Sequence, residues 1–343
     1  MKKNISGMKL GLLMVPFITL ITLSSGVSVD AEVATPDAQP ITGEAVPKVE
    51  QKPFDDIDIG SSYYVQLKYL KDHKLINGYE DNTFRPKNTI NRAEAAMAMS
   101  KALLDFEIPE NTTKKIAEVD YADLPKNHWA HDSVEKLTTL GIVKGYTEKN
   151  NTVQIFQPEK TINLAEAVKM IISIEMMKDK NLKLPTSMKS SFKDVDGSEW
   201  FAPYIELAKD KTLLTYSTKM LIYPQDEVTR GEFMDLLYRA LRTREPGHFF
   251  GRGTFYSDFF EGRGTSNDEI FTQNGYTAAN KELPFNTKLE VTYLRNGQKV
   301  QVRVNDRGPF TPSLSLDMTR KAFTELANPS EGIIPIEYSI VTE

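Results

Sequence analysis

Three carboxylates near the C-terminal end of the chain could act as acids or bases. Asp306 lies in the string Asn-Asp-Arg-Gly-Pro-Phe, Asp317 follows eleven residues later, and Glu269 precedes both. Cleaving a glycosidic bond requires a carboxylic acid that protonates the leaving oxygen and a group that stabilises the oxocarbenium-like centre. A carboxyl group whose pKa is raised by burial or by a neighbouring charge suits this chemistry near neutral pH.

The segment around these carboxylates has the pattern of short strands. Residues 288–294 and 300–304 alternate apolar and polar side chains, and Asn296 and Gly297 between them predict a hairpin turn. One helix is expected over 319–326. About 95 residues of short strands with a single helix predict a closed barrel. We therefore expect an all-β domain over 247–343.

Four strings in this segment carry a family resemblance: GTFYSDFFEGRGTSNDEIF, YTAANKELPFNTKLEV, NGQKVQVRVNDRGPF and LSLDMTRKAF, in this order. Together they resemble the rare-lipoprotein-A-like domain, a double-psi β-barrel related to expansins and to some lytic transglycosylases. The resemblance covers nearly all of residues 250–341. It implies an enzyme that cleaves peptidoglycan glycan strands as a lytic transglycosylase. No feature of the sequence points to a metal or an organic cofactor.

The resemblance also implies roles for single residues. Asp306 matches the acid/base position, Asp317 the second acidic position, and Glu269 the acid of an Asn-Gly-Glu-x-Phe string. The family motif places Asp306 in the barrel groove, where we expect burial and a neighbouring carboxylate to raise its pKa. The substrate-binding positions are Tyr256, Thr265, Asn280 and Arg307. The family often has His where Asn280 stands, and Asn cannot shuttle a proton near neutral pH. A non-catalytic, expansin-like wall-loosening module or a structural S-layer-associated protein is therefore the alternative.

Residues 53 to about 243 contain three similar segments. Their shared glutamates, Glu94, Glu166 and Glu232, lie 72 and 66 residues apart. Each segment is expected to form a helix, a Gly-containing loop and a second helix, and Gly78 is expected to end the first helix with a positive φ. Thr or Asn residues close to each glutamate predict N-caps of the second helices. Self-similarity of this period predicts a repeat architecture.

The second helices open with INRAE at 90–94, INLAE at 162–166 and VTRGE at 228–232. These strings resemble the S-layer homology module, whose fold is a three-fold helical prism and whose usual role is binding pyruvylated secondary cell-wall polysaccharide. Repeats are expected over 53–110, 118–182 and 190–244. The resemblance implies polysaccharide binding by Arg92, Arg230, Trp129, Trp200, Gly78 and Gly145.

Three positions depart from the repeat motif. Leu164 replaces the motif Arg in the second copy, Ser62 stands where Trp is expected in the first, and Thr215 replaces the loop Gly in the third. An Arg suits an acidic sugar because its fork binds a carboxylate bidentately, and a Trp face suits a sugar ring. Helix packing is the alternative role for the Trp residues, and a solvated surface position for the Arg residues. We expect fewer than three working sites.

The N-terminus predicts export. A basic start with Lys2, Lys3 and Lys9 precedes an apolar run over 10–23, and small residues lead to Ala31. This pattern predicts a signal peptide over 1–31. An uncleaved membrane anchor is the alternative, but the run is short for a bilayer core, which needs about 20 residues. Residues 32–52, which contain three prolines, predict a linker.

The composition of the chain limits the classes of partner that it can bind. A formal net charge of −5 argues against electrostatic binding of nucleic acid or anionic lipid by the chain as a whole. The absence of cysteine excludes disulfides and Cys-ligated metals. We expect a secreted, multidomain protein of the cell wall or S-layer of a Gram-positive-type envelope: an α-helical three-repeat prism followed by an all-β double-psi β-barrel. Its expected partners are peptidoglycan and secondary polysaccharide, with no membrane insertion after signal cleavage.

Overall fold

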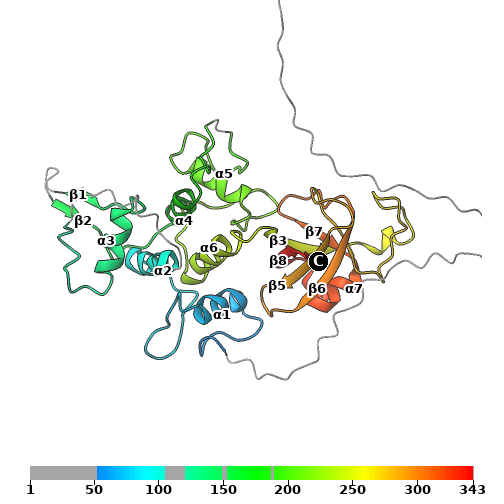
Figure 1. Cartoon of the computed structure of the whole chain (residues 1–343), viewed down its shortest axis with the longest axis horizontal. Helices are drawn as coiled ribbons and strands as arrows, with labels where there is room; N and C mark the ends of the chain where they lie inside the picture. Colours follow the sequence, from blue (N-terminus) through cyan, green and yellow to red (C-terminus); the bar gives the residue numbers. More distant parts are fainter. Residues whose placement is uncertain (1–51, 105–119, 149–152, 187–188, 343) are drawn as a thin grey trace, which may run out of the picture. The chain divides into compact units, whose positions relative to one another are not determined.

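The computed structural model describes residues 52–104, 120–148, 153–186 and 189–342. The predicted signal peptide and all but the last residue of the predicted linker lie outside this part of the chain. No helix within the described ranges is both long enough and apolar enough to cross a bilayer. Helices occupy the first part of the described chain and barrel strands the last part (Figure 1).

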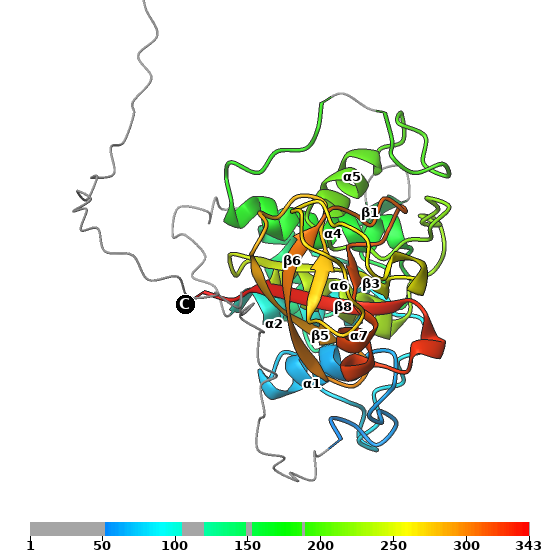
Figure 2. The same ribbon diagram turned by 90° about the vertical axis from the view of Figure 1, so that its right-hand side faces the viewer.

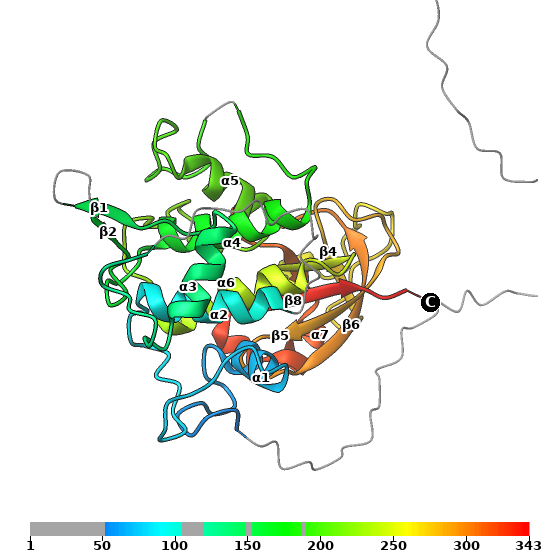
Figure 3. The same cartoon turned by 60° about the vertical axis from the view of Figure 1, so that its left-hand side comes forward.

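The predicted helix–loop–helix repeats are confirmed (Figure 1). The helix pairs are α1 (Tyr64–Asp72) with α2 (Arg92–Leu104), α3 (His131–Thr139) with α4 (Leu164–Lys178), and α5 (Ala202–Asp210) with α6 (Arg230–Arg242). The second repeat also contains a hairpin, β1 (Tyr146–Glu148) and β2 (Val153–Ile155), which projects away from the helices in Figure 3.

Three backbone hydrogen bonds close the repeats into a ring. The N–H of Ile90 donates to the carbonyl of Val228, that of Val228 to Ile162, and that of Ile162 to Ile90, at 3.0, 3.0 and 3.3 Å. All three side chains are buried in the core of the repeats. Each of these residues stands two positions before the second helix of its repeat. The helices α2, α4 and α6 therefore start around one pseudo-three-fold axis.

Each second helix also starts against the turn of the next repeat. The N–H of Arg92 donates to the carbonyl of Lys160 (2.9 Å), that of Leu164 to Asp226 (3.0 Å), and that of Arg230 to Asn88 (2.8 Å). The first N–H groups of an α-helix have no partner inside the helix. Here the neighbouring repeat accepts from them, so the first repeat joins the second, the second the third, and the third the first.

The predicted N-caps are confirmed. Asn163 and Glu166 form a capping box at α4, and Thr229 and Glu232 form one at α6. At α2 the Glu94 N–H donates to the side chain of Asn91 (2.8 Å), and the Asn91 N–H donates to the carboxylate of Glu94 (3.2 Å). The shared glutamates that define the repeat are therefore helix-capping residues.

The prediction that Gly78 ends the first helix with a positive φ is wrong. Helix α1 ends at Asp72, and the residue in the left-handed region is Lys74, with φ 59°. Gly141 (φ 72°) and Thr212 (φ 58°) follow the first helices of the other two copies in the same way.

Gly78 and Gly145 are instead required by close packing. A Cβ on Gly78 would lie 2.8 Å from the ring of Phe54, and a Cβ on Gly145 would lie 2.2 Å from the ring of Tyr121 and 2.5 Å from the carbonyl oxygen of Ile155. Real Cβ atoms do not approach neighbours this closely. Only glycine lets the loop after the first helix pass over these aromatic rings.

The C-terminal part is a closed six-stranded barrel in the order β3-β7-β4-β6-β5-β8. Its strands are β3 (His248–Phe255), β4 (Thr277–Ala279), β5 (Lys288–Tyr293), β6 (Lys299–Asp306), β7 (Leu316–Met318) and β8 (Ile334–Ile340). The β3–β7 and β4–β6 pairs are parallel and the other four pairs are antiparallel. Figure 2 shows β4, β5, β6 and β8 with α7 (Arg320–Leu326).

The predicted hairpin and helix of this domain are confirmed. Strands β5 and β6 pair antiparallel across a turn in which Gly297 has φ 77°. Helix α7 packs against β6 and β3. The barrel core consists of the inward side chains of these elements, including Leu289, Val291, Val302, Val304, Leu316, Phe323 and Ile336.

A polar network joins the third repeat to the barrel. The hydroxyl of Tyr238 on α6 donates to Glu337 on β8 (2.5 Å), and the Arg242 Nε donates to the same carboxylate (3.0 Å). Burial and the Glu337 charge raise the pKa of Tyr238. Phe250 and Leu294 of the barrel belong to the same buried apolar cluster as the repeats. The two parts are therefore packed together rather than only tethered.

Replacing Gly145 by Ala should destabilise the repeats, because the new methyl group meets Tyr121 and the Ile155 carbonyl. We expect a loss of about 1–3 kcal/mol in the free energy of unfolding, as for other overpacked sites. The measurement is urea denaturation of the full chain. Gly264→Ala is the matched control, because a Cβ there meets nothing within 4 Å. Equal stability of the two variants would contradict the close-packing role.

Candidate functional site

Two carboxylates lie on either side of strand β4. Ala279 is the register partner of Asp306 on β6 and also of Asp317 on β7. Adjacent strands lie about 4.8 Å apart, so the two acids are carried by the backbone on both sides of one small residue. The structure thus brings together two of the three carboxylates that the sequence singled out.

Asp306 is surrounded by hydrogen-bond donors. The N–H and hydroxyl of Ser266 donate to Oδ1 at 2.9 and 2.5 Å, and the N–H of Arg307 donates to the same oxygen at 2.8 Å. The hydroxyl of Tyr256 donates to Oδ2 at 2.7 Å. Four donors around one carboxylate stabilise its ionised form.

The expectation that burial raises the pKa of Asp306 is wrong in its net direction. Burial does raise it, but the hydrogen bonds from Ser266, Tyr256 and Arg307 together outweigh burial and hold the pKa of Asp306 below its usual value. Asp306 is therefore ionised near neutral pH.

Asp317 has the opposite environment. Burial, and then the charge of Asp306, raise its pKa to about 6. Its Oδ1 is buried and has no hydrogen-bond partner among the residues that the structure describes. The pair therefore holds one ionised and one readily protonated carboxyl group, which is the combination that acid catalysis beside a stabilising charge requires.

Tyr256 interacts electrostatically with both acids and hydrogen-bonds one of them. Its hydroxyl donates to Asp306, and its pKa is raised by burial, by that hydrogen bond and by the charges of Asp306 and Asp317. The phenol therefore remains a donor. Its ring contacts Phe271 at 4.6 Å and Phe260 at 5.6 Å between centroids.

Glu269 forms a clamp between its own loop and strand β6. Its carboxylate pairs bidentately with Arg303 at 2.7 and 2.8 Å and accepts from Asn305 at 3.0 Å. The hydrogen bond from Arg303 is the main reason that the pKa of Glu269 falls to about 2. The same loop carries Ser266, a donor to Asp306. These contacts favour a positioning role for Glu269; its predicted catalytic role stays a prediction.

The remaining predicted binding residues also support local structure. The Asn280 side chain is buried, accepts from the N–H groups of Glu282 and Leu283, and donates to the Ser315 carbonyl. Arg307 donates to the carbonyls of Asn280 and Leu283. Thr265 is buried, and its hydroxyl donates within its own loop, to Asn267 and to the Glu269 carbonyl. Substrate contact by these three residues stays a prediction.

Sequence reasoning missed Ser266 and several exposed apolar side chains. Phe310, the last residue of the Asn-Asp-Arg-Gly-Pro-Phe string, is 81% exposed. Phe259 is 64% exposed, which excludes a core position for it. The Arg263 guanidinium lies 3.5 Å from the centroid of the Phe259 ring. The doublet of Phe259 and Phe260 in an otherwise polar stretch was the available signal.

Cationic side chains gather at the junction of the first and second repeats, which we call the basic junction. The guanidinium of Arg92 is mostly buried, donates to the carbonyls of Phe156 and Lys144 at 2.8 and 2.9 Å, and lies over the Tyr146 ring. Lys160 donates to the Tyr146 hydroxyl (3.3 Å). Burial, and then the charges of Lys144 and Arg92, lower the pKa of Lys169, while the charge of Glu166 acts in the opposite direction. Three cationic groups therefore interact here, and Lys160 lies close by at Tyr146.

Part of this pattern recurs at the junction of the third and first repeats. Arg230 donates to the Phe84 carbonyl at 3.0 Å and lies over the rings of Tyr79 and Phe84. Its guanidinium also pairs with Glu94 at 2.8 Å. Both motif arginines thus join neighbouring repeats. Glu94 compensates the charge of Arg230, whereas Arg92 has no ion pair with a carboxylate among the residues that the structure describes.

The junction of the second and third repeats contains a pocket, and we call it the open junction. Here Leu164 takes the place of the motif Arg, and a pocket of ≈ 470 Å³ lies beside it. Its charged lining includes Asp226 and Glu227, which stand where the basic junction has Lys160 and Thr161. Ser62 lines the same pocket. Beside the missing Arg this junction therefore carries the carboxylates of Asp226 and Glu227, where the basic junction carries Lys160.

The structure also corrects the alignment of the third copy. One backbone hydrogen bond at the end of the first helix recurs in each repeat and fixes the register: Leu75 to Leu70, Ile142 to Leu137, and Leu213 to Ala208. Three residues further on stand Gly78, Gly145 and Tyr216. Tyr216, not Thr215, therefore occupies the glycine position, where its ring packs edge-on against Phe192.

Trp129 and Trp200 are 54% and 53% exposed. Core packing therefore does not account for these side chains, which leaves their polysaccharide contact as a prediction.

Among the described residues, His131, Asp132 and Glu135 have ligand atoms spaced for a metal ion. They lie on the surface at the start of α3, and the barrel carboxylates are not part of that group.

Lowering the pH should remove stability that the Glu269 clamp provides. Its folded pKa is about 2, below the ordinary 4.5, so the contribution is complete above pH 4.5 and disappears as the pH falls through 2. Because Glu269 is partly exposed, we expect a contribution of only about 1 kcal/mol. Urea unfolding of wild type and Glu269→Gln between pH 2 and 6 should therefore show a difference that shrinks in acid. A pH-independent difference would contradict the clamp.

Two families match this chain. Residues 250–338 match the family described as lytic transglycolase, and residues 53–96, 120–168 and 191–234 match the S-layer homology domain. The endolytic peptidoglycan transglycosylase RlpA of Campylobacter jejuni is 41% identical over 91 residues, 26% of this chain and 33% of that protein. The cellulosome-anchoring protein of Acetivibrio thermocellus is 29% identical over 194 residues, 57% of this chain and 40% of that protein.

Among solved structures, the expansin of Clavibacter michiganensis is 25% identical, covers 28% of this chain and 51% of that chain, and has a TM-score of 0.24. The chain spans well under half the length of either curated relative.

Proposed function

The chain contains three S-layer homology repeats followed by a barrel of the RlpA type, as the two resemblances predicted, and on this premise we propose a wall-anchored lytic transglycosylase. The repeats indicate anchoring at the cell surface. The barrel is proposed to cleave the glycan strands of peptidoglycan. The observation that carries this proposal is the carboxyl pair on either side of β4, with Asp306 ionised and Asp317 protonated up to about pH 6.

In the proposed reaction Asp317 is the proton donor. It protonates the leaving oxygen as the glycosidic bond breaks, and the nearby Asp306 carboxylate stabilises the positive charge that develops on the sugar. The 6-hydroxyl of the same sugar then attacks C1 and gives its proton to the Asp317 carboxylate. The products are a strand with a 1,6-anhydro end and a strand with a free hydroxyl, and Asp317 is protonated again.

This assignment exchanges the order of roles expected from the sequence, in which Asp306 was the first choice for the acid. The environment supports the exchange, since Asp306 accepts four hydrogen bonds that favour its charged form. Tyr256 and Ser266 are proposed to hold Asp306 in place. Asn280 does not need to shuttle a proton in this scheme, because Asp317 performs both proton transfers.

The basic junction is the proposed site for an acidic wall polysaccharide. Its cations include Lys160, whose counterpart in the open junction is Asp226. A pyruvyl ketal carries a carboxylate, which cationic groups stabilise. Export and cleavage near Ala31 are part of the same proposal, since wall anchoring requires them.

Replacing Asp317 or Asp306 by Asn should lower cleavage of peptidoglycan by about 10²–10⁴-fold, the usual contribution of general acid–base groups. Purified peptidoglycan is incubated with the full chain or a variant, and new ends are identified by mass spectrometry. New 1,6-anhydro ends from the wild type support the proposal. The matched control is Asp258→Asn, because Asp258 is an exposed acid outside the pair.

Two other results of the mass-spectrometry experiment would assign a different function to the barrel. Reducing ends without anhydro sugars would make the barrel a hydrolase. Glycan binding with no new ends would favour the expansin-like reading, which the replacement of the family His by a fully hydrogen-bonded Asn280 keeps open.

Activity should depend on the protonation of Asp317. The pKa of this group is about 6 before substrate binds, so kcat/KM should fall as the pH rises through 6. The alkaline limb should approach a tenfold decrease per pH unit. A pH profile of the full chain between 4 and 8 measures it, and a constant kcat/KM across this range would exclude Asp317 as the proton donor.

Removing a charge from the basic junction should weaken polysaccharide binding. Lys160→Gln should raise the Kd for the acidic wall polysaccharide by about tenfold, as expected for one lost charge-assisted contact. Asp226→Asn, at the equivalent position of the open junction, is the control and should leave the Kd unchanged or slightly lower. Sedimentation with purified walls measures both, and equal loss in the two variants would place binding elsewhere.

A further inference from the structure

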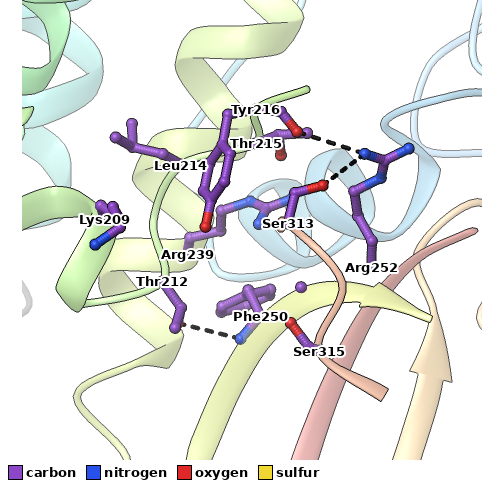
Figure 4. Close-up of a pocket in the computed structure, with 11 residues that line it drawn as sticks. Lys209, Thr212, Leu214, Thr215, Tyr216, Arg239, Phe250, Arg252, Ser313 and Ser315 are labelled. Carbon is purple, nitrogen blue, oxygen red and sulfur yellow. Dashed lines mark hydrogen bonds between the residues drawn. The ribbon is translucent and has the colours of Figure 1, made fainter. Parts of the chain in front are cut away.

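A second, smaller pocket lies where the third repeat meets the barrel (Figure 4). It has a volume of ≈ 60 Å³. Helices α5 and α6 and the loop after α5 line one side, and strand β3 with the loop before β7 line the other. The lining comprises Lys209, Thr212, Leu214, Thr215, Tyr216, Arg239, Phe250, Gly251, Arg252, Ser313 and Ser315.

The charges that line this pocket all have one sign. Lys209, Arg239 and Arg252 contribute three positive charges, and no lining residue is acidic. In Figure 4, Lys209 and Arg252 stand on opposite sides, with Arg239 and Ser313 between them. Asp235, outside the pocket, pairs with Arg239 at 2.8 Å and compensates one of the charges.

Arg239 and Arg252 are held in place by the protein. Arg239 is 3% exposed, its Nε donates to Asp235, and its guanidinium lies 5.0 Å from the centroid of the Phe250 ring. Arg252 donates to the hydroxyl of Ser313 at 3.0 Å and, at 3.4 Å, to the Tyr216 carbonyl. Within the described part of the chain, Arg252 has no carboxylate partner that compensates its charge.

The third cation is only loosely paired. The Lys209 Nζ lies 3.6 Å from Asp210 and 3.9 Å from Glu206, beyond hydrogen-bond distance of either. Arg252 is thus the lining cation without a carboxylate partner among the described residues, and a partly buried cation of this kind is costly unless another anion is present. The pocket therefore has preorganised donors whose natural complement is a negatively charged oxygen.

The size of the pocket limits which anion it can hold. A bound water occupies about 10–15 Å³ by this measure, so the space holds about four waters or the oxygen atoms of one small anion. Arginine forks match carboxylate and phosphate oxygens in particular. A sugar ring does not fit in this volume, but a charged substituent at the end of a larger molecule does.

We propose that this pocket binds a single small oxyanion, a carboxylate or phosphate group, between the third repeat and the barrel. The site is separate from the barrel carboxylates and from the basic junction of the first two repeats, and shares no residue with either. It does not depend on the proposed catalysis. A ligand there contacts both the anchoring repeats and the barrel, through Lys209 and Arg239 on one side and Arg252 and Ser313 on the other.

The test is a titration of the full chain with inorganic phosphate and, separately, with acetate, at constant ionic strength, followed by thermal unfolding. Binding to the folded state raises Tm in a saturable manner. Arg252→Gln and Lys209→Gln should each raise the Kd at least tenfold. Lys219→Gln, which removes an exposed charge that does not line the pocket, is the matched control and should leave the Kd unchanged.

The outcomes separate the sources of the anion. Saturable binding of phosphate but not acetate points to a phosphate-bearing polymer or free phosphate, and a teichoic-acid fragment that competes with phosphate then identifies the polymer. Binding of acetate as well points to a carboxylated sugar or peptide end. The proposal is overturned if neither anion binds saturably, or if both pocket variants bind as tightly as the Lys219 control, whether or not the barrel cleaves peptidoglycan.

Discussion

The ring of backbone hydrogen bonds through Ile90, Ile162 and Val228 is the constraint on which the helical part depends. Each bond joins residues 66 to 138 positions apart, so no repeat can complete its own second-helix start without the next one. A buried backbone group without a partner is costly, and here the partner is always supplied by a neighbour. The three copies close the circle, which is why the repeats form one structural unit.

Closure of the ring leaves the three junctions free to diverge. The basic junction keeps the motif Arg and adds lysines, the third–first junction neutralises its Arg with Glu94, and the open junction replaces the Arg by Leu164. Because the ring uses main-chain atoms only, these side-chain changes leave the fold intact. The electrostatic character of each junction can therefore change without loss of the shared architecture.

Much of the fold could be predicted from the sequence. The repeated glutamates, the hairpin at Gly297 and helix α7 depend on local patterns that a sequence shows directly. The order of the carboxyl pKa values could not be predicted, because Ser266 approaches Asp306 from a loop 40 residues away. The role of Gly78 was missed for the same reason: the clash that requires it is with Phe54, a long-range contact rather than a local φ.

The hydrogen bonds between α6 and β8 have a consequence for how this protein can be divided. A barrel separated from its repeats would expose Phe250 and Leu294 and would leave the Glu337 carboxylate without Tyr238 and Arg242. Its terminal strand is therefore adapted to this particular anchor. Fusing the barrel to another anchoring domain therefore requires redesign of the surface around Glu337. A gene fusion made between α6 and β3 without that redesign would join two surfaces that do not match.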